Sequence, residues 1–159
     1  MNTMTPSKPR IPDRKVPAQA IKAMRALAPL IAESGLEPSL LELVRMRASQ
    51  LNGCARCLDM HSKDARAAGE TEQRLYLLGA WREVELYSPR ERAALAWTEA
   101  VTRLDDGHVS DEVHAAVREQ FSEDETIALT LQVIEINGWN RLNVAFRGEA
   151  GNYQPGMYR

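Results

Sequence analysis

Apolar residues recur with the period of an α-helix along most of the chain. Over residues 18–34 they follow three- and four-residue spacing from Ile21 to Ile31, which predicts one helix that ends at Gly35. A second helix is expected from Pro38, with an apolar face that runs from Leu41 to Leu51. The Asn52-Gly53 pair marks its end, because this dipeptide favours a turn.

The same period predicts five further helices. Ser88 and Ser122 each precede a glutamate by three residues, which is the pattern of a capping box at a helix N-terminus. The final helix is apolar on nearly all sides between Ile127 and Ile136, which predicts a place in the core or at a subunit interface. Gly138 within it indicates that another helix approaches closely. The further helices are expected at 54–68, 71–78, 88–104, 110–121 and 122–146.

No segment alternates convincingly between apolar and polar residues as a half-buried strand would. We therefore expect an all-α fold, a compact multi-helix bundle of about six to seven helices. Residues 1–17 have no helical pattern and contain four prolines, each of which removes a backbone donor and disfavours helix before it. The sequence predicts an extended N-terminal arm at 1–17 and a single helical domain at 18–159.

The composition excludes several classes of protein. Twenty basic and 22 acidic residues give a net charge of −2, with both signs interspersed, so we expect no nucleic-acid or anionic-membrane partner. No apolar run reaches the roughly 18 residues that a spanning helix needs. The N-terminus also lacks the apolar segment of a secretory signal, so the expected location is the cytoplasm.

The candidate chemistry lies in one short segment of the third predicted helix. Cys54, Cys57 and His61 are spaced so that all three side chains line one face of a helix. A thiol in the first turn has a lowered pKa, because unpaired backbone N–H groups there favour a negative charge. A disulfide across so short a loop constrains the unfolded chain little, so reactivity explains the pair better than stabilisation does.

Other interpretations of these residues stay open at this point. The two cysteines and His61 could supply three ligands to zinc, although no second Cys/His cluster accompanies them. Both cysteines could also be inert core residues. Glu42 lies among leucines and would act as a general base if burial raised its pKa.

The final helix contains an unusual set of polar residues. Asn137, Asn140, Arg141 and Asn143 lie in an otherwise apolar segment. Hydrogen bonding across a subunit contact is the favoured explanation, because a buried amide must be satisfied. The alternative is that one of them lines the thiol site.

Four of these residues resemble a family motif. Glu42 lies twelve residues before Cys54, Cys57 completes a Cys-x-x-Cys, and His61 follows four residues later. This pattern resembles the alkylhydroperoxidase AhpD-like family of the carboxymuconolactone decarboxylase superfamily, in its single-domain form. The likeness covers roughly residues 20–147. Some peroxidases of that family carry a histidine directly before the second cysteine, where this chain has Arg56.

The resemblance implies a helical subunit that assembles as a trimer or hexamer. It also implies a proton relay in which Glu42, through His61, deprotonates a cysteine. Cys57 would attack the hydroperoxide, and the resulting sulfenic acid would condense with Cys54 to form a disulfide. A dithiol protein or a small thiol would then reduce that disulfide.

The expected function is a thiol-dependent hydroperoxidase or disulfide oxidoreductase in antioxidant defence. Its catalytic residues would be Glu42, Cys54, Cys57 and His61, with no cofactor and no metal. The alternatives are an enzyme like carboxymuconolactone decarboxylase, a non-catalytic thiol sensor or a metal-binding oligomer.

Overall fold

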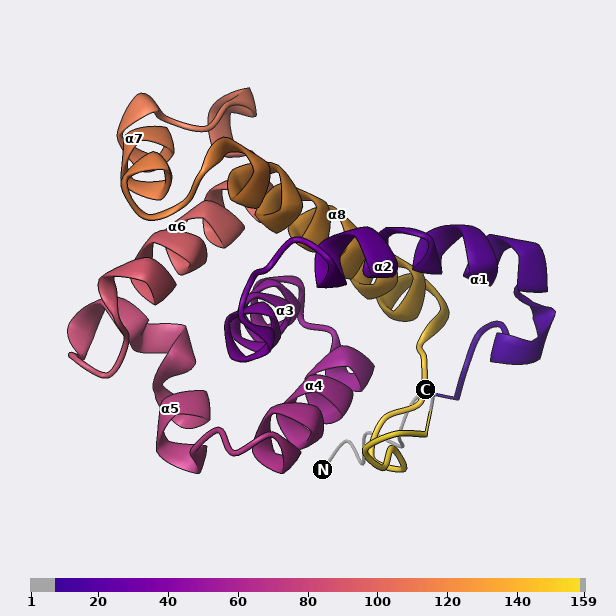
Figure 1. The fold of residues 1–159 in the computed structure, drawn as a ribbon. Helices are drawn as coiled ribbons and strands as arrows, with labels where there is room; N and C mark the ends of the chain where they lie inside the picture. Colours follow the sequence, from indigo (N-terminus) through magenta and orange to yellow (C-terminus); the bar gives the residue numbers. More distant parts are fainter. Residues whose placement is uncertain (1–7, 158–159) are drawn as a thin grey trace.

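The computed structural model describes residues 8–157 and is helical throughout, without a strand in that range (Figure 1). The α-helices are α1 (Ala18–Arg25), α2 (Leu27–Ala32), α3 (Pro38–Asn52), α4 (Ala55–Ala67), α5 (Glu72–Leu77), α6 (Pro89–Arg103), α7 (Asp111–Gln120) and α8 (Glu123–Phe146). Short 3₁₀ helices span Asp13–Lys15, Leu78–Glu83 and Asp105–Gly107. The all-α prediction is confirmed.

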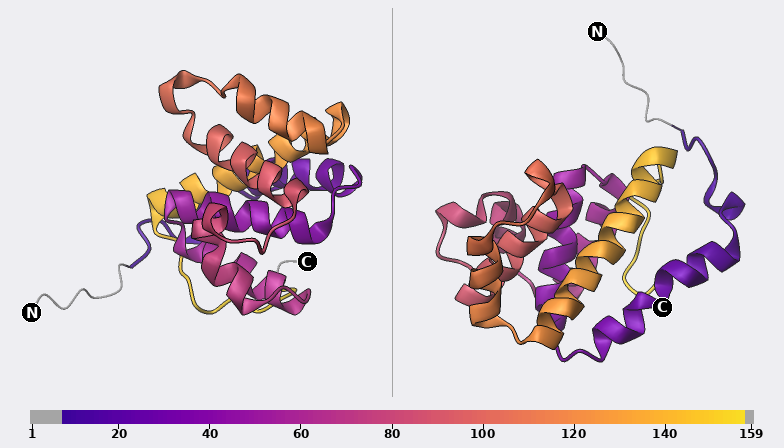
Figure 2. Two further views of the ribbon diagram at one scale, coloured as in Figure 1. Left: turned by 90° about the vertical axis from the view of Figure 1, so that its left-hand side faces the viewer. Right: turned by 90° about the horizontal axis from the view of Figure 1, so that it is seen from above.

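Helices α3 and α8 form the centre of the bundle. Helix α3 packs against α4, α6 and α8, and α8 also contacts α1, α2 and α7 (Figures 1 and 2). Leu43, Val44, Leu129 and Val133 are fully buried between these elements. The burial of each such side chain stabilises the fold by about 1.5–3 kcal/mol. The two long helices therefore supply much of the stability of the core.

Several predicted helix boundaries agree with the structure. The capping boxes at Ser88 and Ser122 both form, with each serine side chain accepting from the glutamate N–H and each glutamate accepting from the serine N–H. The close approach predicted at Gly138 is also present. The methyl group of Met24 in α1 lies 3.5 Å from the position that a Cβ would take.

The first predicted helix is divided in two. Residues 18–34 form α1 and α2, which are separated at Ala26. Pro29 explains the break, because its nitrogen cannot donate to the carbonyl of Arg25 and its ring crowds that carbonyl. The helical period continues across the break, which is why the apolar pattern alone predicted a single helix.

Both terminal segments lie near the junction of α4 and α8. The Arg10 N–H donates to the carbonyl of Phe146 at 2.9 Å, and the Tyr153 hydroxyl donates to Asp64 of α4 at 2.8 Å. Residues 1–7 of the predicted arm lie outside the described residues. The division into an arm at 1–17 and a domain at 18–159 therefore stays a prediction.

Candidate active site

A tight turn between α3 and α4 positions the first cysteine. Gly53 ends α3 with φ of 63°, a left-handed conformation that glycine adopts without a steric penalty. The Cys54 N–H then donates to the carbonyl of Ser49 at 3.0 Å. Cys54 is the N-cap of α4, and its sulfur accepts the Cys57 N–H at 3.4 Å. The sulfur thus takes the place that a serine or aspartate oxygen usually occupies.

The two sulfurs lie together inside the protein. Cys54 Sγ and Cys57 Sγ are 2.7 Å apart, and both cysteines are free. Each is only 1% exposed, and they pack with Ala48, Ile136 and the partly buried Trp139. The spacing therefore brought the two thiols together as predicted, and the apolar surroundings exclude most water from them.

His61 and Glu42 form a pair between the same two helices, α4 and α3. The His61 Nδ1 lies 3.0 Å from Glu42 Oε2, which joins α4 to α3. Arg45 donates to the other carboxylate oxygen of Glu42 at 2.5 Å. Figure 1 shows these two helices side by side, so the four motif residues meet at one interface.

The expectation that burial raises the pKa of Glu42 is wrong, because the pKa is lowered. Burial alone raises the pKa of this carboxyl, but the hydrogen bonds and charges of His61 and Arg45 outweigh it and lower the pKa below its usual value. Glu42 therefore stays ionised near neutral pH. It is suited to orient His61 and to stabilise a positive charge on it, rather than to take a proton itself.

The two thiols have opposite pKa shifts. The hydrogen bond with Cys57 lowers the pKa of Cys54 to about 7, opposed by burial and assisted by the Cys57 N–H and by Arg56. The hydrogen bond with Cys54, burial and the negative charge on Cys54 raise the pKa of Cys57. When the pair carries one negative charge, that charge therefore lies on Cys54 and the shared proton on Cys57.

The asparagines of α8 are satisfied within this chain. Asn52 Nδ2 donates to Asn137 Oδ1 at 3.0 Å and to Asn140 Oδ1 at 2.9 Å. Asn140 Nδ2 in turn donates to Ser49 Oγ at 3.0 Å. The favoured explanation, hydrogen bonding across a subunit contact, is therefore wrong for Asn137 and Asn140.

Asn143 lies at the thiol site, as the alternative interpretation held. Its Nδ2 donates to the carbonyl of Trp139 at 2.9 Å and lies 3.7 Å from Cys57 Sγ. A Cβ at Gly148 would come within 2.4 Å of Asn143 Oδ1, so the absence of a side chain there leaves room for the amide. The sequence contained one signal for this placement, a polar residue in an otherwise apolar helix.

Arg56, the position that departs from the family pattern, faces the N-terminal segment. Its guanidinium forms an ion pair with Asp13. Across residues 8–157 no three His, Cys, Asp or Glu side chains are placed to hold a metal ion. No helix in the same range has the length and apolar character needed to cross a membrane.

Comparison of the sequence with known proteins identifies a family and several relatives. The sequence profile of the Carboxymuconolactone decarboxylase family matches residues 18–100. The uncharacterized protein YdfG of Bacillus subtilis is 39% identical over 143 residues, which are 90% of this chain and 97% of YdfG. The uncharacterized protein Rv2313c of Mycobacterium tuberculosis is 29% identical over 140 residues. That region is 88% of this chain but 45% of Rv2313c.

Solved structures share the fold. ATU0492 of Agrobacterium tumefaciens is a protein of unknown function whose description suggests an antioxidant defence protein of the AhpD type. It superposes with a TM-score of 0.86 at 39% identity, over 92% of this chain and 100% of its own. The debrominase Bmp8 superposes with a TM-score of 0.73 at 21% identity, over 82% of this chain and 70% of its own, and shows the fold alone. Because the profile match covers more than half of its length, the chain belongs to the carboxymuconolactone decarboxylase family, and it has the AhpD-like fold.

Proposed function

We propose that the protein is a thiol-dependent hydroperoxidase or disulfide oxidoreductase that acts in antioxidant defence. One observation carries the proposal: two free sulfurs 2.7 Å apart, on the same helix as a histidine that is bonded to an ionised glutamate. A thiolate supplies the nucleophile, its neighbour supplies the second sulfur of a disulfide, and His61 can move a proton. The catalytic residues are Glu42, Cys54, Cys57 and His61.

The reaction consumes two electrons in each turnover. A hydroperoxide oxidises the pair to a disulfide and is itself reduced to an alcohol and water. A dithiol reductant protein or a small thiol then returns the pair to two thiols by exchange. No cofactor is required, because both electrons come from sulfur.

Thiol titration before and after peroxide tests this function. We expect the native chain to lose two thiols when one equivalent of hydrogen peroxide is added at pH 7, and dithiothreitol to restore both. The Cys54→Ser, Cys57→Ser double variant is the control and should consume no peroxide above the uncatalysed rate. Two unchanged thiols in the native chain after prolonged exposure would contradict the proposal and favour a decarboxylase-like or non-catalytic role.

We also propose that identical chains assemble in the cytoplasm, as a trimer or hexamer. Three large apolar side chains support assembly, since Leu30 of α2 and Ile127 and Ile134 of α8 are each more than half exposed. Ile127 and Ile134 are seven residues apart, so they share one face of α8. Exposed aliphatic side chains on one helix face are typical of a surface that another subunit covers.

A further inference from the structure

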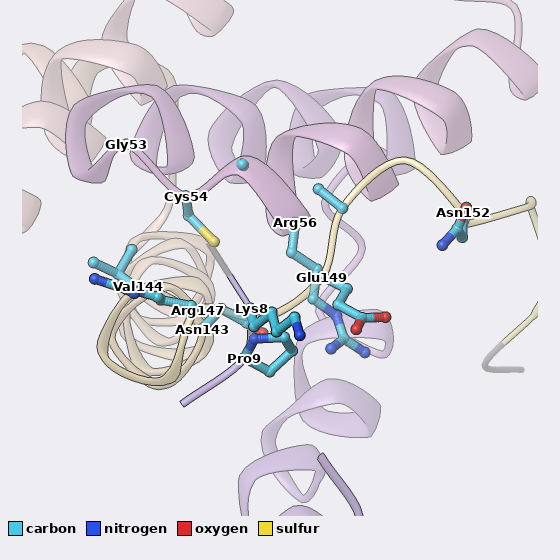
Figure 3. A pocket seen from close by; sticks show the side chains of 13 residues that line it. Lys8, Pro9, Gly53, Cys54, Arg56, Asn143, Val144, Arg147, Glu149 and Asn152 are labelled. Atoms are coloured by element: carbon cyan, nitrogen blue, oxygen red, sulfur yellow. The ribbon is translucent and has the colours of Figure 1, made fainter. Parts of the chain in front are cut away.

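A cavity of about 710 Å³ lies directly in front of the thiol pair. It is bounded by the N-terminus of α4, the C-terminus of α8 and the two terminal segments of the described chain (Figure 3). Arg56, Asn143 and Glu149 are among the side chains that line it. A volume of this size admits a small organic molecule, and a molecule held in this cavity would border Cys54.

Only one of the two cysteines borders this cavity. Cys54 lines it, and its sulfur points from the start of α4 towards the space above Asn143 and Pro9 (Figure 3). Cys57 is not among the lining residues. Both cysteines are 1% exposed, so the contact of Cys54 with the cavity is narrow, and Cys57 has no contact with it.

The helix geometry favours negative charge on the sulfur that borders the cavity. Cys54 is the N-cap of α4 and accepts the Cys57 N–H, so its sulfur receives the partial positive charge of the helix N-terminus. The positive charge of Arg56, two residues further on, also lowers the pKa of Cys54. Cys57 is the third residue of α4, and the negative charge on Cys54 raises its pKa.

We propose that Cys54 is the sulfur that attacks the substrate and that Cys57 is the resolving sulfur, with His61 as its base. This assignment rests on the proposed function and gives each of its four residues one task. It reverses the order that the family resemblance implies, in which Cys57 attacks first.

Oxidation of the pair takes place in two steps. The Cys54 thiolate attacks the terminal oxygen of a hydroperoxide, an S–O bond forms, the O–O bond breaks, and the alkoxide takes a proton from water to leave as an alcohol. Cys54 is then a sulfenic acid. The Cys57 sulfur attacks the Cys54 sulfur, an S–S bond forms, and the hydroxyl group leaves with a proton as water.

The histidine and glutamate serve the second step. His61 lies four residues after Cys57, one helical turn away, and its Nδ1 is bonded to Glu42 Oε2. The carboxylate fixes the proton on Nδ1, which leaves Nε2 free to accept the Cys57 proton and deliver it to the departing hydroxyl. Cys54 depends less on such a base, because its pKa is lowered to about 7 and a thiolate is present at neutral pH.

Trapping of sulfenic acid in two matched variants tests the order. Full-length Cys57→Ser and Cys54→Ser proteins are treated with one equivalent of hydrogen peroxide in the presence of dimedone, and the adduct is located by mass spectrometry. We expect Cys54 in the Cys57→Ser variant to be labelled at least tenfold faster than Cys57 in the Cys54→Ser variant. Equal or faster labelling of Cys57 overturns the assignment while leaving the proposed function intact.

Alkylation of the native protein gives a test that does not depend on the variants. A substoichiometric amount of iodoacetamide should label Cys54 before Cys57, with a rate that is half-maximal near pH 7. Preferential labelling of Cys57 would overturn the order. If native thiols resist peroxide and neither variant yields an adduct, the proposed function fails together with this inference.

Discussion

At the scale of single residues, contacts rather than residue types decide the chemistry. Cys54 and Cys57 are the same type of residue, three positions apart, yet Cys54 borders a cavity and caps a helix while Cys57 does neither. The spacing in the sequence predicted that the two sulfurs would share a face. It could not predict their difference, because that difference arises from the turn at Gly53 and from the cavity that distant segments enclose.

Glu42 shows the same limit. Its place among leucines and its distance from Cys54 identified it as a candidate site residue. The direction of its pKa shift could not be predicted, because Arg45 and His61 reverse the effect of burial. The place of Asn143 at the thiol site was harder still to predict, because its contact with Cys57 joins residues 86 positions apart in the chain.

The lowered pKa of Glu42 leads to a prediction about stability and pH. Its contribution to stability is fully present above its ordinary value of 4.5 and is lost as the pH falls through the lower pKa of the folded state. We expect Glu42→Gln to cost about 1–2 kcal/mol at pH 7, because it removes hydrogen bonds between charged groups. The cost should shrink below about pH 4, as measured by urea unfolding.

Glu72→Gln is the matched control for that measurement. The Glu72 side chain is 62% exposed and its nearest ion-pair distance is 3.8 Å, so the change should alter stability by less than about 0.5 kcal/mol at either pH. A cost for Glu42→Gln that stays constant from pH 7 to pH 3 would show that the charge of Glu42 adds nothing.

At the scale of helices, most boundaries follow from signals next to each other in the chain. Serine caps, Pro89 in the first turn of α6 and Gly53 after α3 all mark helix ends. These signals are local, so the sequence alone was enough to predict them. Pro29 is also local, but the apolar period on both sides of it concealed the break between α1 and α2.

The Ser88 capping box is open to a direct measurement. Ser88 Oγ accepts the Glu91 N–H at 3.2 Å, and Glu91 Oε2 accepts the Ser88 N–H at 2.8 Å. We expect Ser88→Ala to lower the free energy of unfolding by about 1 kcal/mol, because one N–H at the start of α6 loses its acceptor. Ser39→Ala, at an exposed position within α3, is the comparison and should change stability by less than half as much. Equal costs for the two variants would remove the cap as the cause.

At the scale of the whole molecule, segments far apart in the chain complete the site. Residues 8–9 of the N-terminal segment and 148–150 of the C-terminal segment line the cavity at the start of α4. Lys63 holds the C-terminal segment through the carbonyl of Tyr153 at 2.9 Å. Neither segment has an apolar period that would have predicted this placement. The all-α class could be predicted, whereas the enclosure of the site could not.

The proposed assembly is tested on the exposed face of α8. We expect the native protein to have a molar mass several times its 17.8 kDa chain mass in light scattering after size-exclusion chromatography. Ile134→Glu should shift the protein towards the monomer by at least tenfold in association constant, because a charge at a covered apolar position must be desolvated. Tyr76→Glu, at a 76% exposed site on α5, is the control and should leave the mass unchanged. A native protein that is already monomeric would contradict the proposal.

The capping role of Cys54 connects the oxidation state to the stability of α4. In the reduced protein a negatively charged sulfur stabilises the first turn of that helix, and a disulfide carries no charge with which to do so. An interaction that stabilises only the dithiol form raises the reduction potential of the couple. The pair would therefore be easier to reduce than an ordinary structural disulfide, a property that suits an enzyme whose sulfurs must be regenerated after every turnover.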